Sequence, residues 1–315
     1  MLEARCAEFF AQGLAVNSRR TYATGQRKFW QFCNLYPSLR ANSSPLPASE
    51  RLLMLFVSWL AQSLSPDSVV VYLASVRSLH IDQGFPDPTL HTPRLRRVIQ
   101  GIRRSASRSR PPRRPITRPI LQAIHAILAH ATPATDALMF WAACCVAFFG
   151  FLRVSEFTST SPFDLTRHLS FFDAQFLPGS PSPALRLRIK SSKTDQLRQG
   201  CFVYIGRSGH SICAVDALLA YVNLRGSSPG PLFQWQTGNP LTPAQVNACL
   251  KDLVSRAGFS GNYSSHSFRI GAATAAAEAG IPAHLIQTLG RWSSSAYLLY
   301  VHTSPDTIAR VAPLL

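Results

Sequence analysis

The chain has 315 residues and a mass of 34.6 kDa, which at roughly 100–200 residues per domain predicts two domains. Hydrophobic residues make up 46%, enough for packed cores, so we do not expect a disordered or fibrous chain. Lys and Arg number 32 against 15 Asp and Glu, and this net charge of +17 favours a polyanionic partner, usually nucleic acid, over a merely basic surface.

Residues 1–104 have helical spacing and no strand pattern. A helix is predicted from Asn17, and further helices begin at Ser49, at Ser65-Pro66 and near Thr92, the last reaching Arg104. Serine before a helix accepts a backbone hydrogen bond, and proline suits the first turn. The polar face of the helix after Asn17 carries four cations that we assign to DNA binding, Arg19, Arg20, Arg27 and Lys28.

The stretch Arg94–Arg118 contains ten arginines and no acidic residue. Its second half is rich in Ser and Pro, so residues 105–118 are predicted to form an extended linker. A basic linker suits a phosphate backbone, whereas a solvated tether or a nuclear-import signal are the other interpretations. The arginines of this stretch assigned to DNA are Arg103, Arg104, Arg108, Arg110, Arg113 and Arg114.

Residues 119–315 form the second predicted domain. Helices are expected over 119–131 and 134–152, and the second contains the longest apolar run, Ala137–Leu152. Apolar and polar residues alternate over Ala184–Lys190, and Cys201–Ile205 is rich in aromatic and β-branched residues. With the turn-rich segment Ser191–Gly200 between them, these two stretches predict a β-hairpin. Helices then return over 214–224, 242–257, 267–279, 281–289 and 293–301. The predicted fold is mainly α, with a helical N-terminal domain and a mixed α/β domain that has a small antiparallel sheet.

The seven cysteines are odd in number and include no Cys-x-x-Cys pair. This pattern supports neither a disulfide framework nor a zinc site, and it favours a reducing compartment. Glu3, Arg5 and Glu8 interrupt the first residues, so no signal peptide is expected. The longest apolar run is slightly short for a membrane span, so we expect a buried helix and no membrane partner.

Two short motifs each contain an arginine and a second ionisable residue three positions away. Arg153 and Glu156 lie three residues apart where the apolar run ends, and a buried arginine requires a partner. His266 and Arg269 have the same spacing at a predicted helix start, where the helix dipole favours an anion. The plain alternative for each motif is an ordinary surface pair.

Two further segments have aromatic or lysine residues in unusual positions. Lys190 and Lys193, two of only four lysines, lie at the predicted hairpin turn, where solvated charge is the plain explanation. The segment Leu289–His302 holds Trp292, Tyr297 and Tyr300, which would otherwise be core aromatics of an amphipathic helix.

In this order, an arginine, a hairpin lysine, His-x-x-Arg, Gly-x-Trp and a tyrosine eight residues later resemble the signature of the tyrosine recombinases, or integrases. The resemblance covers the outline of the chain and is motif-specific over residues 153–302. It implies a helical core-binding domain over 1–104, the basic linker, and a catalytic domain over 119–315. It also implies cleavage of double-stranded DNA through a 3′-phosphotyrosine, with no metal and no other cofactor, by four protomers on two duplexes.

The resemblance assigns a role to each motif. Arg153 and Arg269 would hold the phosphate, because a guanidinium presents a planar fork to two oxygens. Lys193 would protonate the leaving oxygen, with Lys190 as the second choice, and His266 would assist proton transfer or hold a phosphate oxygen.

The remaining roles concern the carboxyl end. Tyr300 would be the nucleophile, with Tyr297 as the alternative, and Trp292 would donate its indole N–H to the phosphate. Glu156 would be an accessory residue that supports the first arginine.

Two features depart from many phage and bacterial integrases. The Trp292 to Tyr300 spacing is one residue shorter, and Arg291 separates Gly290 from Trp292. Both features resemble the recombinases of eukaryotic mobile elements, the Crypton and DIRS/Ngaro-like groups. This resemblance implies integration or excision of a mobile element in the nucleus; a non-eukaryotic host would place the protein in the cytoplasm on DNA.

Other interpretations remain for the tail and for the activity. The apolar tail that ends at Leu315 either packs within the chain or is exchanged between protomers. A DNA-binding descendant without catalysis and a type IB topoisomerase-like relaxase are the two alternative functions.

Overall fold

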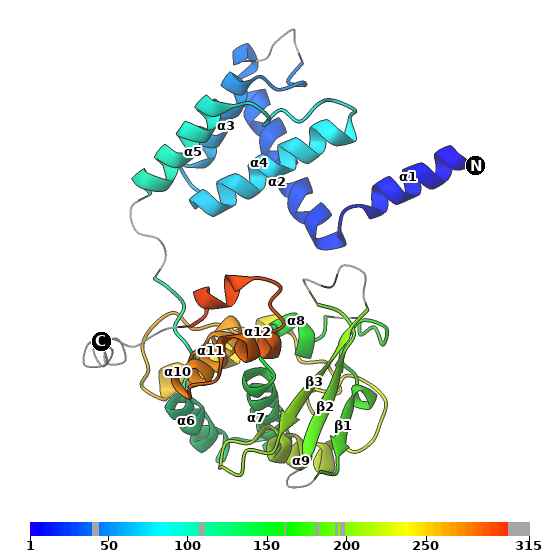
Figure 1. Cartoon of the computed structure of the whole chain (residues 1–315), viewed down its shortest axis with the longest axis vertical. Helices are drawn as coiled ribbons and strands as arrows, with labels where there is room; N and C mark the ends of the chain where they lie inside the picture. The colour runs from blue at the N-terminus through cyan, green and yellow to red at the C-terminus, as the bar shows by residue number, and fades with distance from the viewer. Residues whose placement is uncertain are drawn as a thin grey trace. The chain divides into compact units, whose positions relative to one another are not determined.

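The computed structural model describes residues 1–39, 44–106, 111–160, 162–179, 183–192, 195 and 199–301 (Figure 1). The chain divides into two compact units, Met1–Arg110 and Pro111–Leu315. Arg108, Arg110, Lys193 and the predicted tail after residue 301 lie outside the described residues.

The described part of the first unit is helical. Its α-helices are α1 (Leu2–Gln12), α2 (Val16–Leu35), α3 (Glu50–Leu60), α4 (Pro66–Asp82) and α5 (Pro93–Ser105), with a 3-10 turn over Pro37–Leu39. The Ser49 and Ser65 hydroxyls accept backbone N–H bonds at the starts of α3 and α4, as the sequence predicts. The core gathers apolar side chains of α2 to α5, among them Phe29, Phe32, Leu53, Phe56, Val57, Val76 and Leu95.

Helix α5 is strongly amphipathic. Leu95 is buried, and Val98, Ile99 and Ile102 pack against the core. Five arginines of this helix are exposed instead, Arg94, Arg96, Arg97, Arg103 and Arg104. The helix therefore turns its apolar side to the unit and a row of cations to solvent.

The second unit contains helices and one small sheet among its described residues. Its α-helices are α6 (Arg118–Leu128), α7 (Ala134–Phe149), α8 (Val154–Phe157), α9 (Ala214–Arg225), α10 (Pro243–Arg256), α11 (His266–Glu278) and α12 (Ala283–Gly290). Two 3-10 turns, η2 (Phe171–Asp173) and η3 (Ser295–Leu299), complete the helical elements. The strands β1 (Ala174–Leu177), β2 (Ala184–Ile189) and β3 (Cys201–Gly206) form an antiparallel sheet in the order β1-β2-β3.

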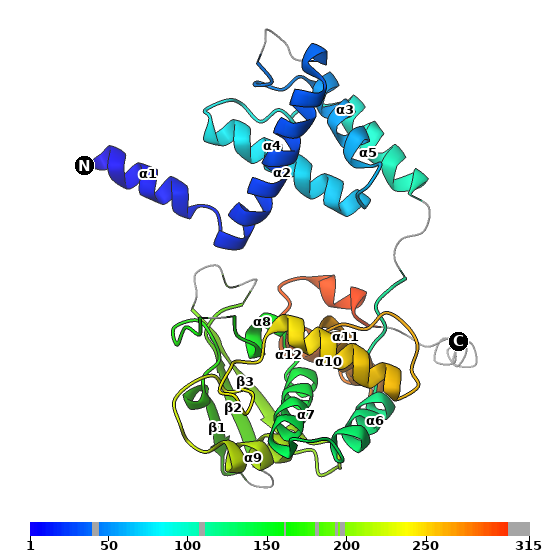
Figure 2. The ribbon, with the colours of Figure 1, turned by 180° about the vertical axis from the view of Figure 1, so that it is seen from behind.

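Helix α7 is the centre of this unit. It lies between α6 and the sheet in both views (Figures 1 and 2), and its residues 139–148 are buried. This matches the prediction of a buried helix from the apolar run, although the helix ends at Phe149, followed by the C-cap Gly150 and by Phe151 with a positive φ of 50°. Among the described residues, no helix is both long and apolar enough to cross a membrane.

The predicted linker is wrong in its second half. Ile116 is fully buried and its N–H donates to the Ser267 carbonyl at 3.0 Å. The Arg114 N–H donates to the Asn262 carbonyl at 2.9 Å. Residues 111–117, the docked segment below, therefore belong to the second unit. The composition of this stretch suggests an unpacked tether, because backbone hydrogen bonds cannot be read from the residue types.

Three smaller predictions differ from the structure. The helix expected over 293–301 is only the 3-10 turn η3, where the Ser294 hydroxyl accepts the Ala296 N–H. Strand β1 is absent from the predictions because its four residues are too short for a clear alternation. The helix expected over 119–131 ends at Leu128.

Candidate functional site

Glu156 is a buried carboxylate at the start of α8. Arg153 precedes this helix, and its backbone N–H donates to Glu156 Oε2 at 2.9 Å. The Arg153 guanidinium Nη1 lies 2.9 Å from Oε1 of the same carboxylate. The Glu156 side chain is 0% exposed, so the pair is not the ordinary surface pair of the plain interpretation.

Arg269 rises from α11 and is completely buried. Its Nη1 donates to the Phe151 carbonyl at 2.5 Å, and its Nη2 donates to the Gly290 carbonyl. Its Nε has no partner in the structure. Burial, together with the nearby positive charge of Arg153, lowers the pKa of Arg269 to about 9, so the group is still a cation at neutral pH.

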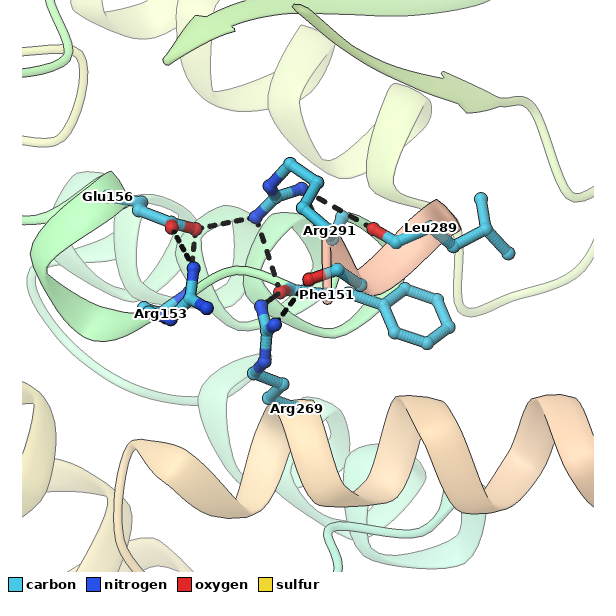
Figure 3. Close-up of polar contacts among 8 residues, drawn as sticks. Phe151, Arg153, Glu156, Arg269, Leu289 and Arg291 are labelled. Atoms are coloured by element: carbon cyan, nitrogen blue, oxygen red, sulfur yellow. Dashed lines mark hydrogen bonds and ion pairs between the residues drawn. The ribbon is translucent and has the colours of Figure 1, made fainter. Parts of the chain in front are cut away.

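Arg291 also belongs to the site, although the sequence motifs give it no role. Its Nη2 lies 2.6 Å from Glu156 Oε2, and its Nη1 donates to the Gly150 carbonyl at 3.2 Å. Figure 3 shows Glu156 between Arg153 and Arg291, with Arg269 pointing from α11 toward Phe151. The only sequence signal is a basic residue after the helix-ending Gly290, which gives no indication of an acidic partner.

The four side chains Arg153, Glu156, Arg269 and Arg291 are called the arginine cluster here. The cluster contains three guanidiniums and one carboxylate, which pairs with Arg153 and Arg291, so an excess of two positive charges remains. An anion such as a phosphodiester matches that excess.

Tyr300 lies beside the arginine cluster on the segment that follows η3. Its ring centroid is 5.1 Å from the ring of Trp292 and 5.0 Å from that of His266. The Arg269 guanidinium carbon lies 4.2 Å from the Trp292 ring centroid and 5.9 Å from that of Tyr300. The indole Nε1 of Trp292 is buried and makes no hydrogen bond. Two unpartnered buried donors, Arg269 Nε and Trp292 Nε1, therefore occur in one place.

Tyr297, the alternative nucleophile, also contacts Trp292, with ring centroids 6.2 Å apart. The structure gives Tyr300 the two additional neighbours His266 and Arg269. Tyr300 therefore has more contacts with the site residues than Tyr297 has.

Lys190, the second choice for the general acid, is held in a structural site. Its Nζ lies 2.5 Å from Asp173 Oδ2 and donates to the carbonyls of Leu165 and His168 at 2.6 and 3.2 Å. These contacts direct the Lys190 ammonium toward groups of its own chain. Lys193, the first choice, is not among the described residues.

The DNA-binding cations predicted from the sequence lie mostly on the surface. Lys28 is half-buried and its Nζ lies 5.8 Å from the Trp59 ring centroid. The exposed members that the structure describes are Arg19, Arg20, Arg27, Arg103, Arg104, Arg113 and Arg114. The α5 arginines Arg94, Arg96 and Arg97 extend this set, and the arginine-rich composition of the stretch was their only signal.

No group of three or more His, Cys, Asp or Glu side chains within the described ranges is placed to hold a metal ion. The polar groups that converge are donors and cations. The charge and hydrogen-bonding capacity of such a set match an anion.

Comparison with known proteins bears on this site. Residues 186–306 match the model of the phage integrase family. No curated protein matches the chain in sequence. The structure resembles XerH site-specific recombinase bound to palindromic difH substrate in a post-cleavage complex, with a TM-score of 0.69 and 18% identity over 96% of this chain and 81% of that chain.

Two other solved structures show the same likeness. A lambda integrase dimer bound to a COC′ core site has a TM-score of 0.63 and 15% identity, covering 96% of this chain and 94% of that one. The Tn1549 transposon integrase with transposon right end DNA has a TM-score of 0.59 and 14% identity, covering 95% of this chain and 99% of that one. Residues 186–306 thus resemble the phage integrase family in sequence, and the chain has the fold of these recombinases and integrases.

Proposed function

We propose that this protein is a site-specific recombinase that cleaves and rejoins DNA strands through a 3′-phosphotyrosine. The observation that carries the proposal is the convergence of Tyr300, Trp292, Arg269 and Arg153 from segments far apart in the chain. The family match over residues 186–306 and the recombinase fold support it.

The reaction exchanges one phosphoester for another. The Tyr300 oxygen attacks the phosphorus, the bond from phosphorus to the 5′-oxygen breaks, and the tyrosine proton passes to His266 or to water. Lys193 protonates the leaving 5′-oxygen. A 5′-hydroxyl of the partner strand then attacks the phosphotyrosine and releases Tyr300, so bond energy is conserved and no nucleotide is consumed.

The pentacoordinate phosphate carries one more negative charge than the substrate. Arg153 and Arg269 neutralise it, and the free indole N–H of Trp292 donates to a phosphate oxygen. Glu156 holds Arg153 in place through the two contacts described above. His266 stands beside the Tyr300 ring, where an imidazole nitrogen can accept the tyrosine proton.

Binding to duplex DNA uses the exposed cations. The α2 and α5 arginines belong to the first unit, whereas Arg113 and Arg114 lie in the docked segment of the second. Such contacts to phosphates release counterions and fix position along the duplex without reading sequence.

The finer parts of the proposal rest on the resemblance of the Gly290-Arg291-Trp292 motif and the spacing to Tyr300. The protein serves integration or excision of a eukaryotic mobile element in the nucleus. Four protomers act on two duplexes, as the resemblance to the tyrosine recombinases implies, and the predicted tail lies outside the described residues.

A suicide substrate tests the activity. Duplex from the ends of the element that encodes the chain, nicked near the cleavage point, traps the covalent adduct. Wild-type protein and Tyr297→Phe form the adduct, and Tyr300→Phe does not. Peptide mapping places the DNA 3′ end on residue 300. An adduct formed by Tyr300→Phe, or binding by wild type with no adduct, contradicts the proposal.

A separate assay distinguishes a topoisomerase-like activity. Supercoiled plasmid without the element's ends is incubated with protein at concentrations that keep it monomeric. A recombinase leaves that plasmid supercoiled, whereas relaxation of any sequence by a monomer identifies a type IB-like relaxase.

A further inference from the structure

Arg291 adopts a backbone conformation that non-glycine residues rarely use. It ends helix α12 with φ 54° and ψ 46°, in the left-handed region. Only three described non-glycine residues have positive φ, and another of them, Phe151 with φ 50°, lies in the same place. Strained backbone of this kind persists where surrounding contacts fix it, and it often marks functional sites.

The left-handed backbone at Arg291 determines where its side chain points. It directs the guanidinium back toward the α7–α8 turn, where Nη1 reaches the Gly150 carbonyl and Nη2 reaches Glu156. The side chain is 17% exposed and the carboxylate is fully covered. The residue after α12 is thereby tied to the turn that carries Arg153.

The Glu156 carboxylate connects Arg291 to Arg153. Oε2 of Glu156 accepts from Arg291 at 2.6 Å and from the Arg153 backbone N–H at 2.9 Å. Oε1 accepts from the Arg153 side chain at 2.9 Å. Without Arg291, Glu156 keeps its two contacts with Arg153, but Oε2 loses its charged partner and the carboxylate is held from one side only.

We infer that Arg291 is a positioning residue: through Glu156 it fixes the Arg153 guanidinium for the scissile phosphate. It also links this guanidinium to the segment that carries Tyr300, nine residues further along the chain. The inference rests on the proposed function for its effect on cleavage, and on the structure alone for its effect on Arg153.

The first test needs no activity. Hydrogen exchange of peptides covering residues 150–158 is measured in the full-length wild type and in Arg291→Ala, Glu156→Gln and Arg256→Ala. Arg256 forms an exposed pair with Asp252 on α10 and serves as the matched control. Exchange in this peptide rises in Arg291→Ala and in Glu156→Gln and stays at the wild-type level in Arg256→Ala. Wild-type exchange in Arg291→Ala overturns the inference.

The second test measures chemistry with the suicide substrate under single-turnover conditions. Arg291→Ala slows adduct formation by about 100-fold, the effect of a misplaced catalytic group, while affinity for uncleaved DNA changes less than about 3-fold. Arg291→Lys recovers part of the rate, because one ammonium reaches only one of the partners. The double variant with Glu156→Gln is no slower than the slower single variant. Wild-type rates in Arg291→Ala contradict the inference.

A neutral substrate separates positioning from general damage. A methylphosphonate at the scissile position removes the charge that Arg153 neutralises. The Arg291→Ala defect then shrinks to less than about 10-fold. A defect of equal size on both substrates indicates structural damage and refutes the inference. Absence of any wild-type adduct overturns the proposed function, and the exchange experiment then decides the inference.

Discussion

The docked segment approaches helix α11 at a glycine. A Cβ built on Gly271 would lie 1.9 Å from the Ile116 carbonyl oxygen, a distance that side chains do not reach in folded proteins. Gly271→Ala therefore requires the segment to retreat by about 1 Å or more. This movement lengthens the Ile116 N–H bond to the Ser267 carbonyl and begins to expose the fully buried Ile116 side chain.

The expected cost follows from those two losses. One backbone hydrogen bond contributes about 1 kcal/mol and burial of an isoleucine about 1.5–3 kcal/mol. Alanine gains about 1 kcal/mol over glycine in a helix, which offsets part of the loss. Gly271→Ala is expected to lower the free energy of unfolding of the second unit by about 1.5–3 kcal/mol.

Gly101 of α5 provides the matched control. It is also a helical glycine, but a Cβ there would meet nothing within 4 Å. Gly101→Ala should therefore stabilise the first unit by about 1 kcal/mol, the opposite sign for the same substitution. Urea unfolding followed by hydrogen exchange reports each unit separately. The reasoning is refuted if Gly271→Ala stabilises its unit and the Ile116 amide stays as protected as in wild type.

Three other predictions concern pH, a lysine pair and salt. Burial lowers the pKa of His80, whose Nε2 accepts the Ala48 N–H at 2.8 Å. The unfolded chain then binds a proton before the folded unit does, so the free energy of unfolding of the first unit falls as the pH drops below about 6.5. Denaturation at several pH values should show this slope, and His80→Gln should flatten it. Lys190→Met should lower the free energy of unfolding of the second unit by about 3 kcal/mol, because it leaves the buried Asp173 carboxylate without its cation. Lys193→Met should instead slow DNA cleavage and leave the free energy of unfolding unchanged. Equal stability of the two lysine variants in thermal unfolding would contradict this. Affinity for duplex DNA should fall about 10³–10⁵-fold between about 50 and 200 mM salt if 6–10 phosphates are contacted, and a flat titration would argue against the cations.

Local sequence signals predict most of the fold. The serine caps of α3 and α4, the buried apolar run of α7 and the β2–β3 hairpin all follow from spacing within a few residues. The docked segment is different, since Ile116 gains its place from Ser267 and Gly271, about 150 residues away in the chain. No local pattern predicts such a pairing.

The candidate site likewise contains residues that the sequence predicts and residues that it does not. Residue types and their order single out Arg153, Arg269 and Tyr300, but the partner of Arg291 depends on a left-handed backbone and on a turn more than a hundred residues earlier. The burial of Lys190 against Asp173 is likewise invisible in a hairpin motif. Sequence identifies groups that carry chemistry better than it identifies the groups that hold them.

The complete burial of Arg269 is costly unless something repays the lost hydration. The two carbonyl contacts and the Trp292 ring supply part of that compensation. A guanidinium has five N–H donors, so these two hydrogen bonds leave three, among them the unpartnered Nε. A phosphate with several acceptor oxygens matches those donors and the free indole N–H of Trp292. Arg269 and Trp292 therefore offer buried donors that a DNA phosphate would satisfy, which is the expected property of a preorganised site for that anion.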